Sequence, residues 1–243
     1  MIERDKVMNR SPQDSRGTAT ATEAALSSPA LSYGFNSAVV MLSNPNGARA
    51  EALRALRTHI VAQHVEDGRR GLAVCAASAG VGATFTAVNL AVGLAQIGVK
   101  VLLIDGDLRN AEVDHFIRPS EPLPGLRQWL EGDGTDFSSS VQSDVIENLS
   151  VIFAGGVSSS AQELLASDRF GATVEGCLRD YELTIIDTPP ANRCADARRI
   201  STVAGYSLIV AKRHLSFVDD IKALTTQLRE DRAQVVGSVL NEA

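Results

Sequence analysis

Residues 75–91 read CAASAGVGATFTAVNLA, and the fold assignment depends on this stretch. The apolar run RGLAVCAA at 70–77 leads into it, and an apolar helical pattern follows it. This arrangement is close to a phosphate-binding loop, whose usual pattern is G-x-x-x-x-G-K-[ST]. Gly82 and Thr84 stand at the second glycine and the hydroxyl position, whereas Ala83 replaces the lysine. The stretch therefore predicts a strand, a phosphate-binding loop and a helix, without the loop's usual cation.

Further apolar runs alternate with helical patterns along the rest of the chain. A continuous apolar strand indicates burial on both faces, and alternation with helices is typical of a parallel sheet. We therefore predict an α/β fold of the P-loop NTPase type, with a parallel sheet and helices on both faces. The expected strands are RGLAVCAA, KVLLIDGDLR, LSVIFAGG, YELTIIDTPP, YSLIVAK and AQVVGSVLN, and the expected helices include 47–65, 161–180 and 216–231.

Acidic residues follow two of these strands. Asp105 and Asp107 come at the end of one, and Asp187 ends another. The carboxyl ends of parallel strands form the ligand-binding edge of such a sheet. Together with the hydroxyl of Thr84, these carboxylates are oxygen ligands of the kind that Mg²⁺ prefers. The alternatives are that the aspartates are helix caps or solvated strand ends, and that the glycine loop is a plain turn.

Composition limits the class of protein. The chain has 243 residues, of which 44% are hydrophobic, and a formal net charge of −6. Such a balance argues against a nucleic-acid binder, which usually carries a basic stripe. The polar N-terminus lacks the apolar core of a secretory signal, so we expect a cytoplasmic protein. Residues 1–46 show little periodicity and are predicted to be a disordered or extended arm, before a domain at 47–243.

Four ordered stretches resemble the cytoplasmic domain of the bacterial tyrosine kinases (BY-kinases) of capsule and exopolysaccharide export. This family belongs to the MinD/ParA-like group of deviant P-loop ATPases. The stretches are EALRALRTHI at 51–60, SAGVGATFTAVNLA at 78–91, VLLIDGDLR at 101–109 and LTIIDTPP at 183–190. They are similar to the family's E-x-x-R-x-x-R helix, Walker A, Walker A′ and Walker B motifs, in that order.

The resemblance implies roles for individual residues. It assigns Mg²⁺ binding to Thr84, Asp105, Asp107 and Asp187, and packing against a neighbouring subunit to Glu51, Arg54 and Arg57. On one helix the last three could equally be ordinary salt-bridge spacing. Weak binding of Mg-ATP or Mg-ADP is the expected cofactor interaction. The implied nucleotide-binding residues are Ser78, Ala79, Gly80, Val81, Gly82, Ala83, Thr84 and Asn241.

The departures from the family pattern shape the expected function. Ala83 removes the lysine, and the three tyrosines, Tyr33, Tyr181 and Tyr206, form no C-terminal cluster. We therefore expect a catalytically impaired kinase relative that acts as scaffold or regulator. Its expected partners are a membrane polysaccharide co-polymerase at the inner face of the membrane and further copies of itself. The alternatives are an active tyrosine kinase and a MinD/ParA-type positioning ATPase. Arg109, Lys212 and Arg213 are candidates to replace the missing charge.

Overall fold

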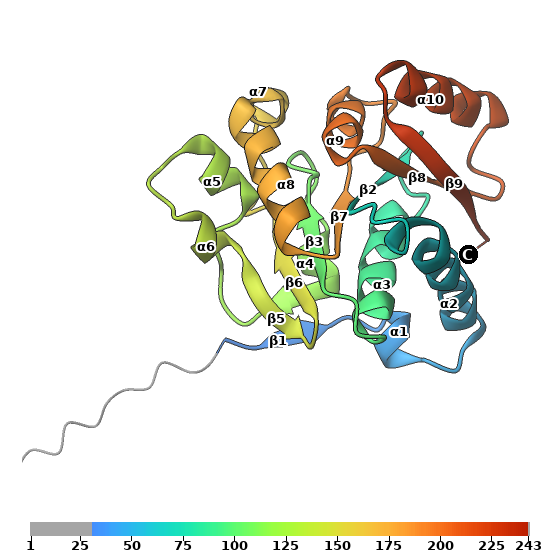
Figure 1. The fold of residues 1–243 in the computed structure, drawn as a ribbon, viewed down its shortest axis with the longest axis horizontal. Helices are drawn as coiled ribbons and strands as arrows, with labels where there is room; N and C mark the ends of the chain where they lie inside the picture. Colours follow the sequence, from blue (N-terminus) through green and yellow to red (C-terminus); the bar gives the residue numbers. More distant parts are fainter. Residues whose placement is uncertain (1–30, 243) are drawn as a thin grey trace, which may run out of the picture. The chain divides into compact units, whose positions relative to one another are not determined.

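Seven strands form the main sheet of the computed structural model, which describes residues 31–242 (Figure 1). They are β2 (Gly71–Ala76), β3 (Val101–Asp105), β5 (Gln142–Ile146), β6 (Leu149–Ile152), β7 (Leu183–Asp187), β8 (Tyr206–Lys212) and β9 (Gln234–Asn241). Their order is β5-β6-β3-β7-β2-β8-β9, and only the β5–β6 pair is antiparallel. The predicted strands are all present, and the mostly parallel sheet is confirmed.

The strand that leads into the glycine loop lies inside the sheet. β2 has β7 on one side and β8 on the other, and all of its residues are buried. Its side chains alternate between the two faces. Leu72 and Val74 join the apolar core on one face, and Ala73 and Cys75 join the core on the other. Burial on both faces explains why this strand is an unbroken apolar run in the sequence.

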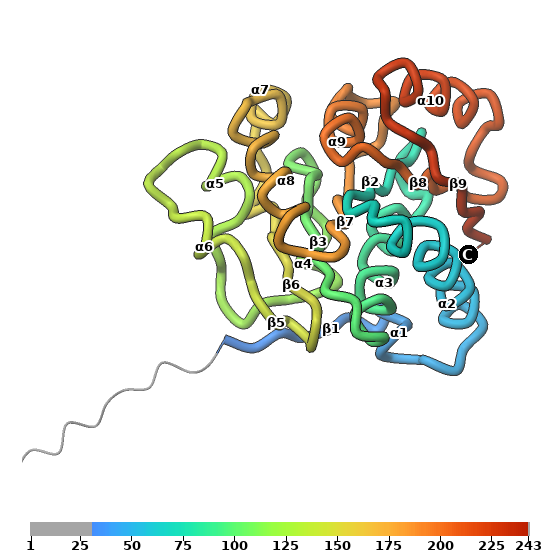
Figure 2. The backbone as a smooth tube through the Cα atoms, viewed as in Figure 1, coloured from blue at the N-terminus to red at the C-terminus, as the bar shows by residue number. Residues whose placement is uncertain are grey.

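Helices cover both faces of the sheet. On one face α3 (Ala83–Ala95) packs against β2, β3 and β7, and α2 (Ala48–Ile60) packs on α3, as the backbone tube shows (Figure 2). Residues 86–95 of α3 are all buried, so this helix is enclosed by its neighbours. The other face carries α8 (Asp168–Asp180), α9 (Asp196–Ala204) and α10 (Val218–Glu230). No helix in residues 31–242 is long and apolar enough to cross a membrane.

Residues 31–46 belong to the folded unit. β1 (Tyr33–Phe35) pairs with β4 (Ile117–Pro119), and α1 (Val40–Ser43) packs on α3. Asn89, wholly buried in α3, holds this segment. Its Oδ1 accepts a hydrogen bond from the Met41 N–H at 3.2 Å, and its Nδ2 donates to the Ala38 carbonyl at 3.0 Å. The structure thus differs from the predicted arm over 31–46, while residues 1–30 lie outside the described residues.

One predicted helix is divided in two. The sequence pattern predicts a helix over 161–180, whereas the structure has α7 (Ala161–Ala166) followed by α8. Ser167 lies between them with extended backbone, and its Oγ accepts a hydrogen bond from the Phe170 N–H at 3.2 Å. A serine oxygen that receives an N–H from the first turn is a common N-cap, which stabilises the start of a helix. The break therefore has a local chemical cause.

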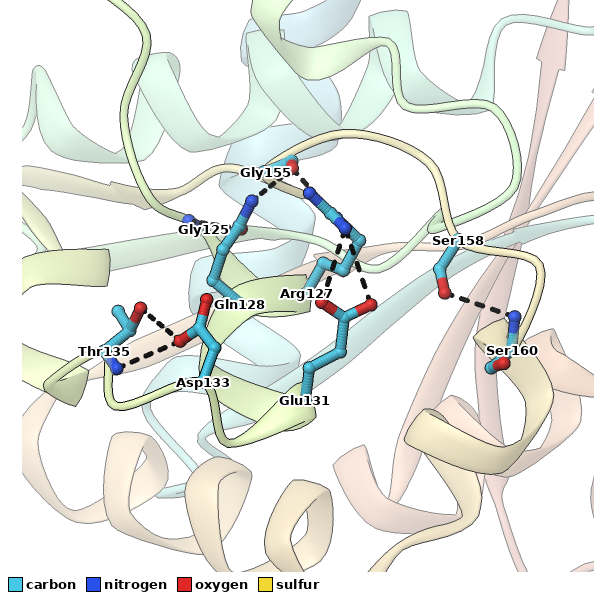
Figure 3. Close-up of polar contacts among 9 residues, drawn as sticks. All are labelled: Gly125, Arg127, Gln128, Glu131, Asp133, Thr135, Gly155, Ser158 and Ser160. Carbon is cyan, nitrogen blue, oxygen red and sulfur yellow. Dashed lines mark hydrogen bonds and ion pairs between the residues drawn. The ribbon is translucent and has the colours of Figure 1, made fainter.

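The loop after β6 is clamped by α5 (Leu126–Glu131), as Figure 3 shows. The Gly155 carbonyl accepts hydrogen bonds from Arg127 Nε at 3.1 Å and from Gln128 Nε2 at 2.8 Å. Gln128 Oε1 in turn accepts from the Gly125 N–H at 3.0 Å. A Cβ atom on Gly125 would clash with the Phe153 carbonyl oxygen, so the close approach of the two backbones requires glycine. The clamp fixes the chain at the carboxyl end of β6.

Candidate functional site: a phosphate-binding loop beside three carboxylates

The glycine loop joins β2 to α3 at the carboxyl edge of the sheet. Gly80 and Gly82 have φ angles of 75° and 90°, a left-handed conformation that side-chain-bearing residues rarely adopt. Gly82 is the N-cap of α3, and Ala83 is the first helical residue. The first N–H groups of a helix lack intrahelical partners, and together with the helix dipole they favour an anion. The backbone of a phosphate cradle is therefore kept, although Ala83 adds no cation.

The predicted Mg²⁺ ligands lie next to this loop. Thr84 Oγ1 donates a hydrogen bond to Asp187 Oδ2 at 2.6 Å. Asp187 and Asp105 are register partners at the ends of neighbouring strands. The two oxygens of Asp105 accept hydrogen bonds from the N–H groups of Asp107 and Val113, both at 3.1 Å. The sheet thus brings together the hydroxyl and the carboxylates that the sequence motifs indicated.

Burial makes the charged forms of these carboxyls costly. Desolvation raises the pKa of Asp105 from 3.8 to about 7, against the opposing effect of its two backbone hydrogen bonds. Desolvation, and then the charge of Asp105, raises the pKa of Asp187 well above its usual value. Desolvation also raises the pKa of Asp107. Within the described residues, Asp187 Oδ1 is buried without a hydrogen-bond partner. A cation beside Asp187 would lower the cost of all three charges.

The residues fit magnesium that arrives with a nucleotide. In residues 31–242, no group of three His, Cys, Asp or Glu side chains has the arrangement to hold a metal ion by itself. Mg²⁺ does not require such a group, because it is usually bound by one or two carboxylates together with phosphate oxygens and waters. The orphaned oxygen of Asp187 and the hydroxyl of Thr84 can supply the protein's share of such a shell.

Two cavities flank the loop. One of about 240 Å³ is lined by the loop residues 78–84 together with Asp107 and Thr188. The other, of about 140 Å³, is lined by Gly80, Val81 and Gly82 together with Lys212 and Asn241. Because β7 and β8 flank β2, the cavities lie on opposite sides of the loop. Asn241 Nδ2 donates to the Val81 carbonyl at 3.1 Å. All of the predicted nucleotide-binding residues are thus brought to one place.

Comparison with known proteins identifies the family. Residues 70–235 match the family model described as "AAA domain". Tyrosine-protein kinase CpsD of Streptococcus pneumoniae serotype 4 is 33% identical over 192 residues, which cover 79% of this chain and 83% of CpsD. The chain belongs to the bacterial tyrosine kinase family. Tyrosine-protein kinase wzc of Salmonella typhimurium is 31% identical over 205 residues, 84% of this chain but only 28% of wzc. The chain therefore spans about a quarter of that larger relative.

Solved structures agree with the family assignment. The kinase domain of Escherichia coli tyrosine kinase ETK superposes with a TM-score of 0.77 at 29% identity, over 84% of this chain and 80% of that chain. The cell division ATPase MinD of Pyrococcus furiosus superposes with a TM-score of 0.61 at 22% identity, over 71% of each chain. The second likeness is one of fold. The chain is thus a kinase-family domain built on the P-loop fold that MinD shares.

The three basic residues that were candidates to replace the family's lysine lie in different places in the structure. Arg109 is engaged elsewhere, because its Nε donates to the buried Asp196 at 2.7 Å. Arg213 lies 3.9 Å from Glu242, at the exposed end of β9. Lys212 does reach the loop, but it lines the smaller cavity on the β8 side. None of the three lines the larger cavity, which Asp107 lines together with the loop.

Sequence reasoning missed a fourth basic residue, Arg193. It lines the larger cavity together with the loop, Asp107 and Thr188. It also missed Arg49, which lines the smaller cavity. The family motif that precedes Arg193 ends at Pro190, so no motif marked this residue. The only available signal was its position shortly after the strand that ends in Asp187, at the edge of the sheet where ligands bind.

The three predicted interface residues lie on α2, and each arginine has contacts within the chain. Arg54 Nη2 donates to Glu51 Oε2 at 2.7 Å, and Arg54 Nη1 donates to the Pro45 carbonyl at 2.6 Å. Arg57 Nη1 donates to the Gly93 carbonyl of α3 at 3.1 Å. Glu51 remains largely exposed, with 73% of its side-chain surface open. Their role in binding a neighbouring subunit stays a prediction.

Proposed function

We propose that this protein is a nucleotide-binding, non-phosphorylating cytoplasmic subunit of an exopolysaccharide or capsule export system. In this role it binds Mg-ATP or Mg-ADP weakly and acts as scaffold or regulator of a membrane polysaccharide co-polymerase. Membership of the bacterial tyrosine kinase family supports the system. The intact loop and carboxylates support nucleotide binding, and the alanine at the lysine position supports the loss of phosphoryl transfer.

One observation carries the proposal: the first residue of α3 is Ala83 in place of the P-loop lysine, while the other residues of the site are present. The lysine of a P-loop contacts the β- and γ-phosphates and stabilises charge during transfer. A hydrogen bond to a charged group contributes about 1.5–3 kcal/mol. Its loss weakens binding by roughly tenfold to a hundredfold, at about 1.4 kcal/mol per tenfold. Phosphoryl transfer is expected to suffer more, because it depends mainly on electrostatic positioning of the transferred group.

The positions of the tyrosines also favour a non-phosphorylating subunit. Tyr206 begins β8 and Tyr181 precedes β7, so both lie at the amino edge of the sheet, opposite the loop. Tyr33 lies in β1, and its hydroxyl donates to Gln142 on the edge strand β5 at 3.3 Å. β6, β3 and β7 lie between β5 and β2. None of the three tyrosines lines either cavity beside the loop.

The proposed partner surface is the exposed side of α2. Glu51 and Arg54 form a surface ion pair there, and such a pair contributes little to stability by itself. Arginine and carboxylate groups on such a face can exchange their intrachain contacts for bidentate contacts with a partner. We place the protein at the cytoplasmic face of the membrane, associated through α2 with the co-polymerase or with further copies of itself.

Titration calorimetry with Mg-ATP and Mg-ADP tests nucleotide binding. We expect weak binding in the parent, and at least about tenfold tighter Mg-ATP binding in Ala83→Lys, from the energy of a charged contact. Ala223→Lys, on the exposed surface of α10, is the matched control and should bind as the parent does. If a folded Ala83→Lys protein bound Mg-ATP with unchanged affinity, the loop would no longer be a phosphate-binding loop.

Incubation with labelled ATP and Mg²⁺ tests the loss of transfer. We expect no phosphotyrosine on Tyr33, Tyr181 or Tyr206, and robust labelling would instead support the active-kinase alternative. In the cell, deleting the gene should lower exopolysaccharide output, whereas the Ala83→Lys allele should leave it largely intact. Normal output together with a mislocalised cellular structure would favour the positioning-ATPase alternative.

A further inference from the structure

A basic residue from a different segment of the chain lines the cavity beside the phosphate-binding loop. Arg193 and the loop residues 78–84 line the same cavity of about 240 Å³. Arg193 follows β7 in the sequence, whereas the family's lysine position, Ala83, opens α3. Asp107 and Thr188 line this cavity too. A phosphate held by the loop on this side would therefore lie between the loop and Arg193.

Backbone hydrogen bonds fix the segment that carries Arg193. The Ala191 N–H donates to the Ala76 carbonyl at 2.9 Å, and the Asn192 N–H donates to the Ala77 carbonyl at 3.0 Å. Both acceptors lie where β2 runs into the glycine loop. One residue on, the Arg193 N–H donates to the Pro190 carbonyl at 3.1 Å, which closes a turn. The segment is thus attached directly to the base of the loop, and Arg193 is placed by that attachment.

The hydroxyl that precedes this segment strengthens the attachment. Thr188 Oγ1 donates to the Val74 carbonyl at 3.0 Å, and Thr188 is buried. Pro189 and Pro190 then restrict the backbone, because each proline ring fixes its own φ angle. The path from Asp187 to Arg193 is therefore stiff and short. A backbone held in this way loses less conformational entropy when a ligand binds than the backbone of a loose loop does.

The head group of Arg193 is available for a ligand. Neighbouring arginines on α9 and on the loop after β3 are engaged: Arg109 pairs with Asp196 at 2.7 Å, and Arg198 pairs with Asp231. Arg193 is exposed, and over residues 31–242 its side chain makes no hydrogen bond or ion pair. A guanidinium group offers a planar fork of donors that matches two oxygens of one phosphate.

We propose that Arg193 contacts the terminal phosphate of the bound Mg-nucleotide and replaces, from the loop after β7, the charge that Ala83 does not provide. This inference rests on the proposed nucleotide binding. The larger cavity contains Asp107, next to the Mg²⁺ side of the site, so it suits the terminal phosphate. The smaller cavity, with Asn241 and Lys212, lies across the loop and suits the remainder of the nucleotide.

The position of the charge has a consequence for nucleotide preference. A lysine at the start of α3 contacts both the β- and the γ-phosphate. Arg193 approaches from the cavity that Asp107 lines, so its contact is concentrated on the terminal phosphate of the triphosphate. The protein should therefore bind Mg-ATP more tightly than Mg-ADP, and this difference should depend on Arg193.

The test is titration calorimetry of Mg-ATP and Mg-ADP with the full chain and five variants. Arg193→Ala should weaken Mg-ATP binding by at least about tenfold, the effect of one charged contact, and Mg-ADP binding much less. Arg193→Lys should keep part of the affinity, because it retains the charge but loses the fork. Arg179→Ala, at the exposed end of α8, is the matched control for net charge and should bind as the parent does. Ala83→Lys combined with Arg193→Ala should recover Mg-ATP binding.

Each result has a distinct meaning. If the parent binds Mg-ATP and Arg193→Ala binds it equally well, the inference is wrong while the proposed nucleotide binding stands. If Lys212→Ala, and not Arg193→Ala, selectively weakens Mg-ATP binding, the charge comes from the β8 side and the inference is also overturned. If the folded parent binds neither nucleotide, the proposed nucleotide binding itself fails. Selective loss of Mg-ATP affinity in Arg193→Ala supports the inference.

Discussion

Replacing Asp187 by asparagine should stabilise the protein in the absence of magnesium and remove its response to Mg-nucleotide. Asp187 is buried beside Asp105, and its Oδ1 has no hydrogen-bond partner among the described residues. Asparagine has nearly the same shape, and its amide oxygen can still accept the hydrogen bond from Thr84. The substitution therefore removes a buried negative charge without opening a cavity.

The size of the effect follows from the strand register. Neighbouring strands lie about 4.8 Å apart, so the in-register carboxylates of Asp105 and Asp187 are separated by roughly 5 Å. Two charges at that distance repel by about 3 kcal/mol at an effective dielectric constant of about 20. Because the pKa of Asp105 is raised to about 7, that carboxyl is only partly charged near neutrality. We expect a gain of about 1–3 kcal/mol in the free energy of unfolding, and a rise in Tm of roughly 2–12 °C.

The stabilisation expected from Asp187→Asn also depends on pH in a defined direction. A carboxyl whose pKa is raised in the folded state costs stability in full above that raised pKa, and the cost disappears gradually as the pH falls from there towards the usual carboxyl pKa of 3.8. The advantage of Asp187→Asn should therefore be largest in mildly alkaline solution and should shrink on acidification. Thermal unfolding in the presence of a chelator, repeated across this pH range, measures the difference.

Asp231→Asn is the matched control, because its carboxylate pairs with Arg198 and the pKa of Asp231 is lowered by that partner. Removing this charge should lower the free energy of unfolding slightly, by less than about 1 kcal/mol for a partly exposed pair. In a second series, Mg-ADP should raise the Tm of the parent but not that of Asp187→Asn. A Tm below the parent's for Asp187→Asn in chelator would refute the argument from charge repulsion.

Three further predictions concern the rest of the fold. Asn89→Ala should lower the free energy of unfolding by about 2–5 kcal/mol, because it leaves the buried N–H of Met41 and the partly buried carbonyl of Ala38 unpaired. Gln96→Ala, which removes one peripheral hydrogen bond to the same segment, should cost about 1 kcal/mol in the same urea titration. His64 is buried and its pKa is lowered chiefly by desolvation, so the parent should lose stability as the pH falls below the usual imidazole value of 6.5. The His64→Gln variant should lose less stability over that interval. Parallel profiles of stability against pH for the two proteins would contradict this. Arg54 and Arg57 replaced together by alanine should weaken self-association or pull-down of the co-polymerase's cytoplasmic ends, and assembly equal to the parent's would show that α2 is not the interface.

The main sheet could be predicted because its parallel strands are buried on both faces and leave continuous apolar runs. β5 (QSDVI) could not, because it is a short edge strand with polar residues. β1 consists of three residues, one of them glycine, and its partner β4 is distant in sequence. The sequence pattern also could not show that residues 31–46 belong to the folded unit. This segment is held by the side chain of Asn89, which appears in the helical pattern only as a polar interruption.

The residues of the candidate site likewise include some that could be predicted from the sequence and some that could not. Asp105 and Asp187 could be located because short motifs tie them to the ends of strands, and Thr84 because its motif ties it to the loop that follows a strand. Parallel strands bring these positions together. Arg193 could not, because its position depends on hydrogen bonds from Ala191 and Asn192 to a strand far away in the sequence. Nor could sequence show that Arg109 is occupied by Asp196. Pairings between side chains of distant segments leave no periodic signal.

The position of β2 inside the sheet has a consequence for how the chain folds. Its two neighbours, β7 and β8, are made more than a hundred residues later, so β2 cannot pair locally as it leaves the ribosome. Contacts between residues distant in sequence slow folding, because the intervening chain must be ordered first. The glycine loop can take its final shape only after residues 183–193 have arrived. Nucleotide therefore cannot guide early folding, and the apolar GLAVCA strand is exposed during synthesis, when it is most prone to aggregate or to need a chaperone.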